Sequence, residues 1–341
     1  MDRSYSGGGV GTLLQEPGIR EDGGCGPHGT QTALEMKSIG PADYARLERF
    51  FADQRYPLSP YTLASILVWS NKLYRPFAAE ADRDLVVGYE LTVHPEDRHL
   101  LMPVGPGPER TPAELAALAV SLGFDAYALV PEDYLERQGR DRVAENFDVR
   151  ELAGYADYVY RTADLAGLEG RPYAKKRNLV RQFQRDFVDQ GRVRVEAMTG
   201  AQEPECAAFL EAWCQERGCD KDPDADLACE KEANLTALRH LETLRFRGLL
   251  LRIDGRVSAF GMASRLTKDM GVLHFEKAFA SAKGLYQYFD QLCAQRLFPG
   301  LEYVNKENDQ GDAGLAKAKE SYRPSAKVRS YRLTLRPAAG R

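Results

Sequence analysis

The chain has 341 residues, of which 43% are hydrophobic and 28% charged, a composition typical of a globular protein large enough for two domains. It contains neither an apolar run of about 18 residues, as a membrane-spanning helix needs, nor the apolar core of a signal peptide, so we expect a cytoplasmic protein. The formal net charge of −4 argues against a nonspecific nucleic-acid coat.

The first half of the chain begins with a glycine-rich segment and then alternates helices with strands. Residues 1–36 show no hydrophobic period, so we interpret them as a disordered leader. The clearest helix start is Thr111, an N-cap followed by Pro112 and by Glu114, and Gly123 ends this helix. The remaining pattern predicts helices over 41–54, 59–68 and 131–138, and strands over 73–78, 85–92, 99–103 and 125–130.

The second half repeats this order more completely. Asp254-Gly255 between two apolar runs predicts a β-hairpin. The pattern predicts helices over 173–190, 203–217, 225–244, 284–297 and 312–321, and strands over 193–197, 246–253, 256–266, 270–279, 301–305 and 327–335. This order resembles that of an acetyltransferase-like (GNAT-like) domain. We therefore predict an α+β fold of mixed, mostly antiparallel sheets flanked by helices, with tandem GNAT-like domains over 37–160 and 161–341.

Polar side chains crowd the end of the predicted strand 301–305. The strand closes on Asn305, and the next residues are Lys306, Glu307, Asn308 and Asp309. Asp312 is then the predicted N-cap of a short helix. On that helix Lys319 follows Leu315 by four residues and so shares its apolar face. A lysine and several carboxylates around one strand end predict a reactive site here.

Several motifs in this half resemble the cytosolic C-terminal domain of phosphatidylglycerol lysyltransferases, and more closely a soluble relative of that domain. The closing motif is Gly314-Leu315, two further residues, and Ala318-Lys319-Glu320-Ser321-Tyr322-Arg323-Pro324. The others are Lys175-Lys176-Arg177-Asn178, Phe275-Glu276-Lys277-Ala278, Tyr286-Gln287 and Val304-Asn305-Lys306-Glu307-Asn308-Asp309. Asn308 departs from the family pattern, which is acidic there. The resemblance covers residues 175–324 and implies tandem acetyltransferase-like domains and aminoacyl transfer from aminoacyl-tRNA.

Aminoacyl transfer from an ester requires recognition of the α-ammonium group, stabilisation of an oxyanion and deprotonation of the acceptor. We predict Lys319 as the oxyanion or phosphate stabiliser, Glu276 or Asp309 as the ammonium-binding carboxylate, and Glu307 as a weaker candidate for the base. The alternative for Glu307 and Asp309 is capping of the loop. Strand alternation predicts that His274 lies on the same face as Glu276, where it is either a packed core histidine or part of the site.

Predicted substrate-binding residues lie on two helices and on the closing segment. Arg177, Arg181 and Arg185 recur at helical spacing, as a phosphate-binding row does, although a solvated face paired with acidic residues is the alternative. The turn before residue 285 has only Gly284 in common with the phosphate-cradling loop of acetyl-CoA enzymes, so coenzyme A is disfavoured. The full predicted set is Lys175, Lys176, Arg177, Asn178, Arg181, Lys283, Gly284, Tyr286, Gln287, Asn305 and Tyr322.

The resemblance and these residues together leave three candidate functions, of which the resemblance implies the first. The first is a soluble aminoacyltransferase that takes its group from aminoacyl-tRNA and gives it to a lipid head group reached peripherally, a peptide or a small molecule. The second is an acyl-CoA-dependent N-acyltransferase, and the third is a non-catalytic module that binds phosphate or RNA. The sequence shows no Ser-His-Asp spacing and no Walker loop, and its six cysteines lack metal-ligand spacing. We therefore expect no bound metal or cofactor.

Overall fold

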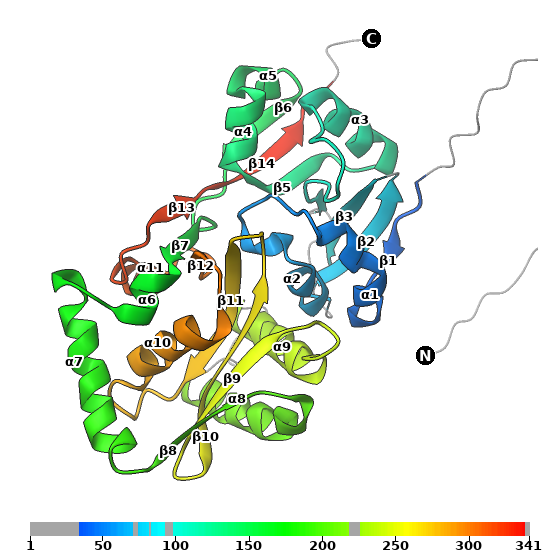
Figure 1. The fold of residues 1–341 in the computed structure, drawn as a ribbon. Coiled ribbons are helices and arrows are strands. Elements are labelled where there is room, and N and C mark those ends of the chain that lie inside the picture. Colours follow the sequence, from blue (N-terminus) through cyan, green and yellow to red (C-terminus); the bar gives the residue numbers. More distant parts are fainter. Residues whose placement is uncertain (1–33, 71–73, 82, 93–97, 218–225, 338–341) are drawn as a thin grey trace, which may run out of the picture. The chain divides into compact units, whose positions relative to one another are not determined.

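A computed structural model describes residues 34–70, 74–81, 83–92, 98–217 and 226–337 of the protein. All of them belong to one compact unit that begins at Leu34. The predicted leader over 1–36 lies outside the described residues except for its last three positions. Two seven-stranded sheets and the helices that cover them make up this unit (Figure 1). The α+β class and the flanking helices predicted from the sequence are confirmed.

The first sheet is built mostly from the first half of the chain. Its spatial order is β1-β2-β3-β4-β5-β14-β6. The strands are β1 (Lys37–Ser38), β2 (Tyr74–Ala81), β3 (Asp84–Leu91), β4 (His99–Leu100), β5 (Ala126–Pro131), β6 (Phe147–Glu151) and β14 (Ser330–Leu335). The helices in this half are α1 (Tyr44–Leu47), α2 (Leu63–Val68), α3 (Pro112–Leu122), α4 (Glu132–Gln138) and α5 (Arg140–Ala144).

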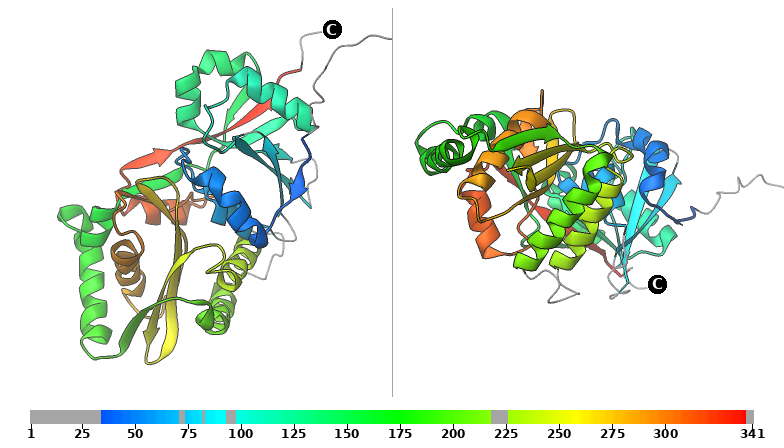
Figure 2. Two further views of the ribbon diagram at one scale, coloured as in Figure 1. Left: turned by 45° about the vertical axis from the view of Figure 1, so that its right-hand side comes forward. Right: turned by 90° about the horizontal axis from the view of Figure 1, so that it is seen from below.

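The second sheet has the order β13-β7-β12-β11-β10-β9-β8. Its strands are β7 (Asp157–Arg161), β8 (Val193–Ala197), β9 (Arg247–Ile253), β10 (Arg256–Arg265), β11 (Met270–Ala278), β12 (Tyr303–Asn305) and β13 (Ala326–Val328). The helices are α6 (Thr162–Gly167), α7 (Ala174–Phe183), α8 (Glu203–Arg217), α9 (Asp226–Arg239), α10 (Leu285–Leu297) and α11 (Ala313–Glu320). Helices α8 and α9 cover one face of this sheet and α10 covers the other (Figure 2).

Two local sequence signals are confirmed in atomic detail. Glu114 Oε2 accepts a hydrogen bond of 2.7 Å from the backbone of Thr111, whose hydroxyl accepts in return from the backbone of Glu114. Gly123 ends α3 in the left-handed conformation with φ +73°. At the predicted hairpin, Asp254 and Gly255 both have positive φ, +51° and +79°, as a type I′ turn requires. Short-range chemistry therefore fixed these positions.

The chain crosses between the sheets at both ends of its second half. The strand predicted over 327–335 is two strands: β13 pairs with β7 in the second sheet, whereas β14 pairs with β5 and β6 in the first. The segment around the predicted boundary at 160 and 161 holds β7 and α6, which the hydrophobic pattern did not reveal. Consequently the first sheet contains β14 from the second half of the chain, and the second sheet contains β7, which spans the predicted boundary.

Candidate functional site

The site lies where β11 and β12 stop pairing. These strands run parallel, but their register covers only Met270–Val272 against Tyr303–Asn305. Beyond it β11 continues to Ala278, while the chain after Asn305 no longer pairs with β11 and exchanges backbone hydrogen bonds with Tyr158 of β7. Polar side chains of the two segments contact each other beside this point, Glu276 with Lys306 and His274 with Glu307, so charged groups do gather at this strand end.

Three charged side chains form a buried cluster on the α10 side of the sheet. Lys306 Nζ donates hydrogen bonds to Asp290 Oδ1 at 2.6 Å and to Glu276 Oε2 at 3.1 Å. The side chains are 14%, 5% and 15% exposed for Lys306, Asp290 and Glu276, respectively. Burial and then the charge of Asp290 raise the pKa of Glu276 to about 7. Burial alone would lower the pKa of Lys306, but Asp290 and Glu276 outweigh it and raise that pKa well above its usual range.

Tyr322 and Lys176 border the same cluster. The ring of Tyr322 lies 3.8 Å from Lys176 Nζ and 5.3 Å from Lys306 Nζ. Burial, followed by the nearby Asp290, raises the pKa of the Tyr322 hydroxyl, and burial lowers the pKa of Lys176. Of the predicted basic helix, Lys176 is thus the side chain that reaches the buried cluster. With both lysines charged and both carboxylates ionised, the cluster is electrically neutral.

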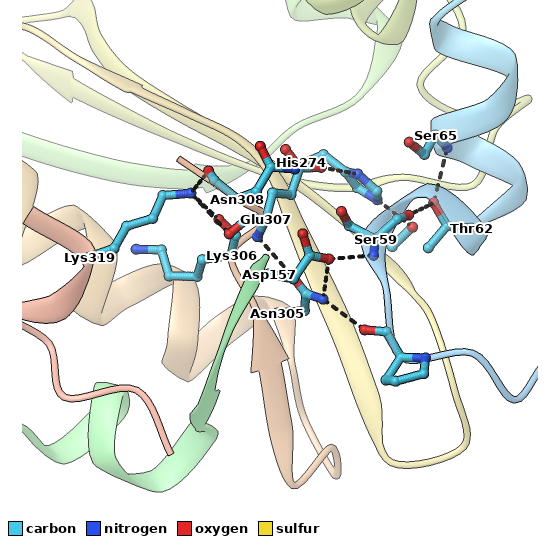
Figure 3. Close-up of polar contacts among 12 residues, drawn as sticks. Ser59, Thr62, Ser65, Asp157, His274, Asn305, Lys306, Glu307, Asn308 and Lys319 are labelled. Carbon is cyan, nitrogen blue, oxygen red and sulfur yellow. Dashed lines mark hydrogen bonds and ion pairs between the residues drawn. The ribbon is translucent and has the colours of Figure 1, made fainter. Parts of the chain in front are cut away.

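Lys319 serves the loop after β12. Its Nζ donates to three backbone carbonyls, those of Lys306 at 2.6 Å, Glu307 at 3.1 Å and Asn308 (Figure 3). These bonds engage all three N–H groups of the ammonium. Burial lowers the pKa of Lys319 to about 8. In this conformation the lysine fixes the backbone of 306–308, and its predicted role at an oxyanion stays a prediction.

The predicted carboxylates Asp309 and Glu307 lie on the same loop but make different contacts. Asp309 accepts from the hydroxyl of Tyr158 and, at 2.9 Å, from the backbone of Gly311, so it caps a turn. Glu307 has a left-handed backbone with φ +57°, and its Oε1 lies 3.1 Å from His274 Nδ1. Loop capping, the alternative weighed for both, describes Asp309, whereas Glu307 contacts a second titratable group.

A β-bulge overturns the predicted face of His274. In the β10–β11 register Met262 pairs with Phe275 and Ala263 with Leu273, so His274 is an extra residue on β11. A bulge shifts the alternation by one residue. His274 therefore packs edge-on against Phe246 and contacts Glu307, while Glu276 reaches Lys306 and Asp290 on α10. The expectation that His274 and Glu276 share a face is wrong for this reason.

Asn305, predicted to bind substrate, is fully buried in a network that joins β12 to β7 and to the segment 57–59, which precedes α2. Its side-chain amide donates to Asp157 Oδ2 at 2.8 Å and to the carbonyl of Pro57 at 2.9 Å, and its oxygen accepts from the backbone of Glu307 at 2.7 Å (Figure 3). Asp157 Oδ2 also accepts from the backbone of Ser59 at 2.6 Å. Burial raises the pKa of Asp157. Asp157 was missed by the sequence reasoning because nothing near it in the chain is charged in a recognisable pattern.

Gly284 is explained by helix packing. Its φ is +87°, and an added Cβ would lie 2.2 Å from the carbonyl oxygen of Leu179 on α7. Glycine is required there because the start of α10 lies directly on α7. Nearby, the Tyr286 hydroxyl accepts a hydrogen bond of 3.2 Å from Trp213 Nε1. Lys283 is exposed and Gln287 half-buried.

Of the remaining predicted substrate-binding residues, three are exposed to solvent and one is engaged by backbone carbonyls. Lys175, Asn178 and Arg181 are exposed. Arg177 is half-buried, and its guanidinium donates to the carbonyls of Leu168 and Gly170 at the preceding turn. The phosphate row predicted over Arg177, Arg181 and Arg185 is thus incomplete, since Arg177 is engaged by backbone and Arg185 by Asp186 at 2.8 Å.

Within the described ranges, no group of His, Cys, Asp and Glu side chains is placed to hold a metal ion. Cys206, Cys214 and Cys293 are buried and are not joined in disulfides. In the same part of the chain, no helix combines the length and apolar character needed to cross a bilayer.

Comparison with known proteins places this geometry in a family. The model of the phosphatidylglycerol lysyltransferase C-terminal family matches residues 59–334. A conserved protein of unknown function from Bacteroides thetaiotaomicron has a similar structure with a TM-score of 0.79 and 27% identity, covering 89% of this chain and 100% of its own. The C-terminal domain of a protein described as a lysylphosphatidylglycerol synthetase from Agrobacterium fabrum gives a TM-score of 0.56 at 14% identity, with 87% and 92% covered. No curated protein matches the chain.

Proposed function

Because this chain belongs to the phosphatidylglycerol lysyltransferase C-terminal family, with an acyltransferase-like fold, we propose that it transfers an aminoacyl group from aminoacyl-tRNA. The acceptor is a lipid head group, a peptide or a small molecule. The observation that carries the proposal is an ammonium group held between two buried carboxylates, since Lys306 Nζ lies 2.6 Å from Asp290 and 3.1 Å from Glu276.

The same carboxylates suit the α-ammonium of an aminoacyl ester. A pair of carboxylates out of water binds an ammonium through short charge-assisted hydrogen bonds. In the proposed complex the donor's ammonium takes the place that Lys306 Nζ holds, and the lysine swings toward the ring of Tyr322, 5.3 Å away. Glu276, with its pKa raised to about 7 by burial and by Asp290, is also matched to accepting a proton at neutral pH.

The donor's nucleic acid would lie along exposed basic residues of α7. Lys175 and Arg181 point to solvent on the helix that also supplies Lys176 to the buried cluster. Phosphates attract such groups by charge alone, and the affinity falls with salt. The chain's net charge of −4 makes a local rather than general attraction the expected form of binding.

Transfer from tRNA charged with a mixture of radiolabelled amino acids tests the proposal. Anionic phospholipid vesicles, a peptide mixture and a small-amine mixture serve as acceptors, and we expect label to move into one of them. Glu276→Gln should lower kcat/KM by about 10- to 150-fold, the value of hydrogen bonds to charged groups. Glu205→Gln is the matched control, because Glu205 is 54% exposed and pairs with Arg252 away from the cluster.

Two outcomes would overturn the proposal. Label that leaves the tRNA no faster than by spontaneous hydrolysis, with all three acceptors, would exclude transfer. Charged tRNA bound no more tightly than by an unrelated acidic protein would exclude the donor. Turnover with acyl-coenzyme A instead would support the acyl-CoA alternative, although Gly284, the one residue in common with that loop pattern, is required here by α7.

A further inference from the structure

A serine, a histidine and a glutamate from three separate segments form one hydrogen-bonded chain near the reactive strand end. Ser264 Oγ on β10 lies 2.8 Å from His274 Nε2 on β11, and His274 Nδ1 lies 3.1 Å from Glu307 Oε1 on the loop after β12. No motif in the sequence joins these residues, because they meet only when β10, β11 and β12 are assembled. The bulge at His274 is what points its ring along this line.

The partners fix the direction of the hydrogen bonds. An ionised carboxylate can only accept a hydrogen bond, so Nδ1 of His274 carries a hydrogen and donates a hydrogen bond to Glu307. Nε2 is then the acceptor, and it receives the proton of the Ser264 hydroxyl. This is the arrangement of a nucleophile, a base and an orienting carboxylate.

The three residues differ in burial, with a deeply buried base between two more exposed partners. The imidazole side chain of His274 is 2% exposed and is packed edge-on against Phe246 with ring centroids 5.4 Å apart. Ser264, at one end, is half-buried, and Glu307, at the other, is 31% exposed. Ser264 is therefore the more accessible partner, while the imidazole of His274 stays out of water and in one orientation.

The loop that carries Glu307 is held rigidly. Lys319 Nζ donates to the carbonyl of Glu307 at 3.1 Å, and the backbone N–H of Glu307 donates to Asn305 Oδ1 at 2.7 Å. Asp157, whose buried Oδ1 lacks a hydrogen-bond partner among the described residues, lies close enough that the charge of Glu307 contributes to its raised pKa, after burial. Adjacent residues of one fixed loop thus serve two sites, Lys306 the ammonium cluster and Glu307 the relay.

We propose that Ser264 is a nucleophile that carries the acyl group covalently, with His274 as its base and Glu307 as a positioning residue. The Oγ of Ser264 attacks the carbonyl carbon of an acyl ester, so that an Oγ–C bond forms and the ester C–O bond breaks. The proton of Oγ passes to His274 Nε2 and from there to the leaving alkoxide. An amine or hydroxyl acceptor then attacks the acyl-serine, gives its proton to His274, and the proton returns to Oγ. Because His274 and Glu276 lie on opposite faces of the sheet, the relay is a second site, separate from the ammonium cluster, and takes an acyl ester of its own.

An assay that needs neither tRNA nor acceptor tests the relay by itself. The full chain is incubated with a fluorophosphonate, which phosphonylates an activated serine with loss of fluoride, and with p-nitrophenyl acetate, and intact-protein and peptide masses are then recorded. We expect one adduct, on Ser264, that is absent in Ser264→Ala. Ser325→Ala is the matched control, since Ser325 Oγ donates its hydrogen bond to the carbonyl of Val159 and not to a ring nitrogen.

Two conservative variants separate chemistry from structure. His274→Gln should slow labelling by about 10²- to 10⁴-fold, the usual contribution of a general base. Glu307→Gln keeps an oxygen that can accept from Nδ1 but removes the charge, so a merely structural role predicts an unchanged labelling rate and the relay predicts a slower one. Thermal unfolding of each variant identifies any that fail to fold.

Failure of this inference is distinguishable from failure of the proposed function. No adduct on Ser264 in the folded wild type, or an adduct that forms equally fast in Glu307→Gln, overturns the relay even if aminoacyl transfer is observed. A Ser264 adduct in a protein that transfers nothing from aminoacyl-tRNA supports the relay and leaves a different acyl ester as its substrate.

Discussion

Two buried lysines thirteen positions apart in the chain differ in what surrounds their ammonium groups. Lys306 is held by the carboxylates of Asp290 and Glu276, and its pKa is raised well above the usual range because these charges outweigh burial. Lys319 donates to three neutral carbonyls, and burial lowers its pKa to about 8. The charge of the partners, more than the depth of burial, therefore decides whether each ammonium is stabilised, and it separates a binding cluster from a structural clamp.

The largest effect is expected on removal of Lys306. Lys306→Met leaves Glu276 and Asp290 buried without the cation that they hydrogen-bond, and breaking a buried ion pair from one side typically costs about 3–5 kcal/mol of unfolding free energy. Urea denaturation at pH 7 measures the loss. The double variant Lys306→Met with Glu276→Gln should recover part of it, because only one buried carboxylate then remains. A loss below about 1 kcal/mol would contradict the idea that this cluster depends on Lys306.

A smaller loss is expected for Lys319. Lys319→Met removes the lysine donor from three carbonyls, but that of Glu307 keeps a hydrogen bond from the backbone N–H of Tyr158 and the segment 306–308 is only half-buried. We therefore expect a total loss of about 1–3 kcal/mol, the cost of one unsatisfied buried polar group. Lys317 on the same helix is exposed, so Lys317→Met should stay within about 0.5 kcal/mol of the wild type and serves as the control. If Lys319→Met were as damaging as Lys306→Met in the same urea series, charge of the partners would not be what separates the two lysines.

The dependence of stability on pH should have opposite signs for the two regions. The pKa of Lys319 falls from 10.5 to about 8 on folding, so between these values the unfolded chain binds more protons and stability rises with pH. The pKa of Glu276 rises from 4.5 to about 7, so between those values the native chain binds more protons and stability falls with pH. Each slope is at most about 1.4 kcal/mol per pH unit.

Unfolding free energies measured across both pH windows check this prediction against variants. The difference between wild type and Lys319→Met should widen as pH rises from 8 toward 10.5, and the stability of Glu276→Gln relative to wild type should increase from pH 4.5 to 7. The ranges are those over which each group titrates in only one of the two states. If the curves of wild type and variant ran parallel in either window, the pKa of that group would not change on folding, and the prediction for that group would be wrong.

How much of the structure around these lysines the sequence predicts depends on how far apart in the chain the interacting residues lie. The cap at Thr111 and the hairpin at Asp254-Gly255 are local, and both were predicted correctly. The polar strand end was also found, since its residues are consecutive. The partner of Lys306 was not, because Asp290 lies on α10 and had no motif around it.

Long-range pairing explains the other misses. A single extra residue in β11 reversed the face of His274, and strand alternation cannot detect a bulge without the register of the neighbouring strand. The segment 327–335 reads as one strand because Val328, Tyr331, Leu333 and Leu335 recur along it with no glycine or proline between them, yet β13 and β14 belong to different sheets. Ser264, His274 and Glu307 lie on three segments, so no spacing rule could have joined them.

The smallest effect is expected at a third lysine, which faces an aromatic ring. Lys176 Nζ lies 3.8 Å from the centre of Tyr322, and burial lowers its pKa, so the cation gains from the ring while it loses hydration. Lys176→Met keeps the apolar stem and removes a cation whose contact with the ring contributes about 0.5–1 kcal/mol and which also interacts with the charge of Asp290. Urea unfolding resolves the loss against Lys175→Met at the exposed neighbouring position. A loss larger than that of Lys319→Met would mean that the charge of nearby Asp290 dominates at Lys176 as well. The expected order of losses, with carboxylate partners first, carbonyl partners second and the ring last, would then be wrong.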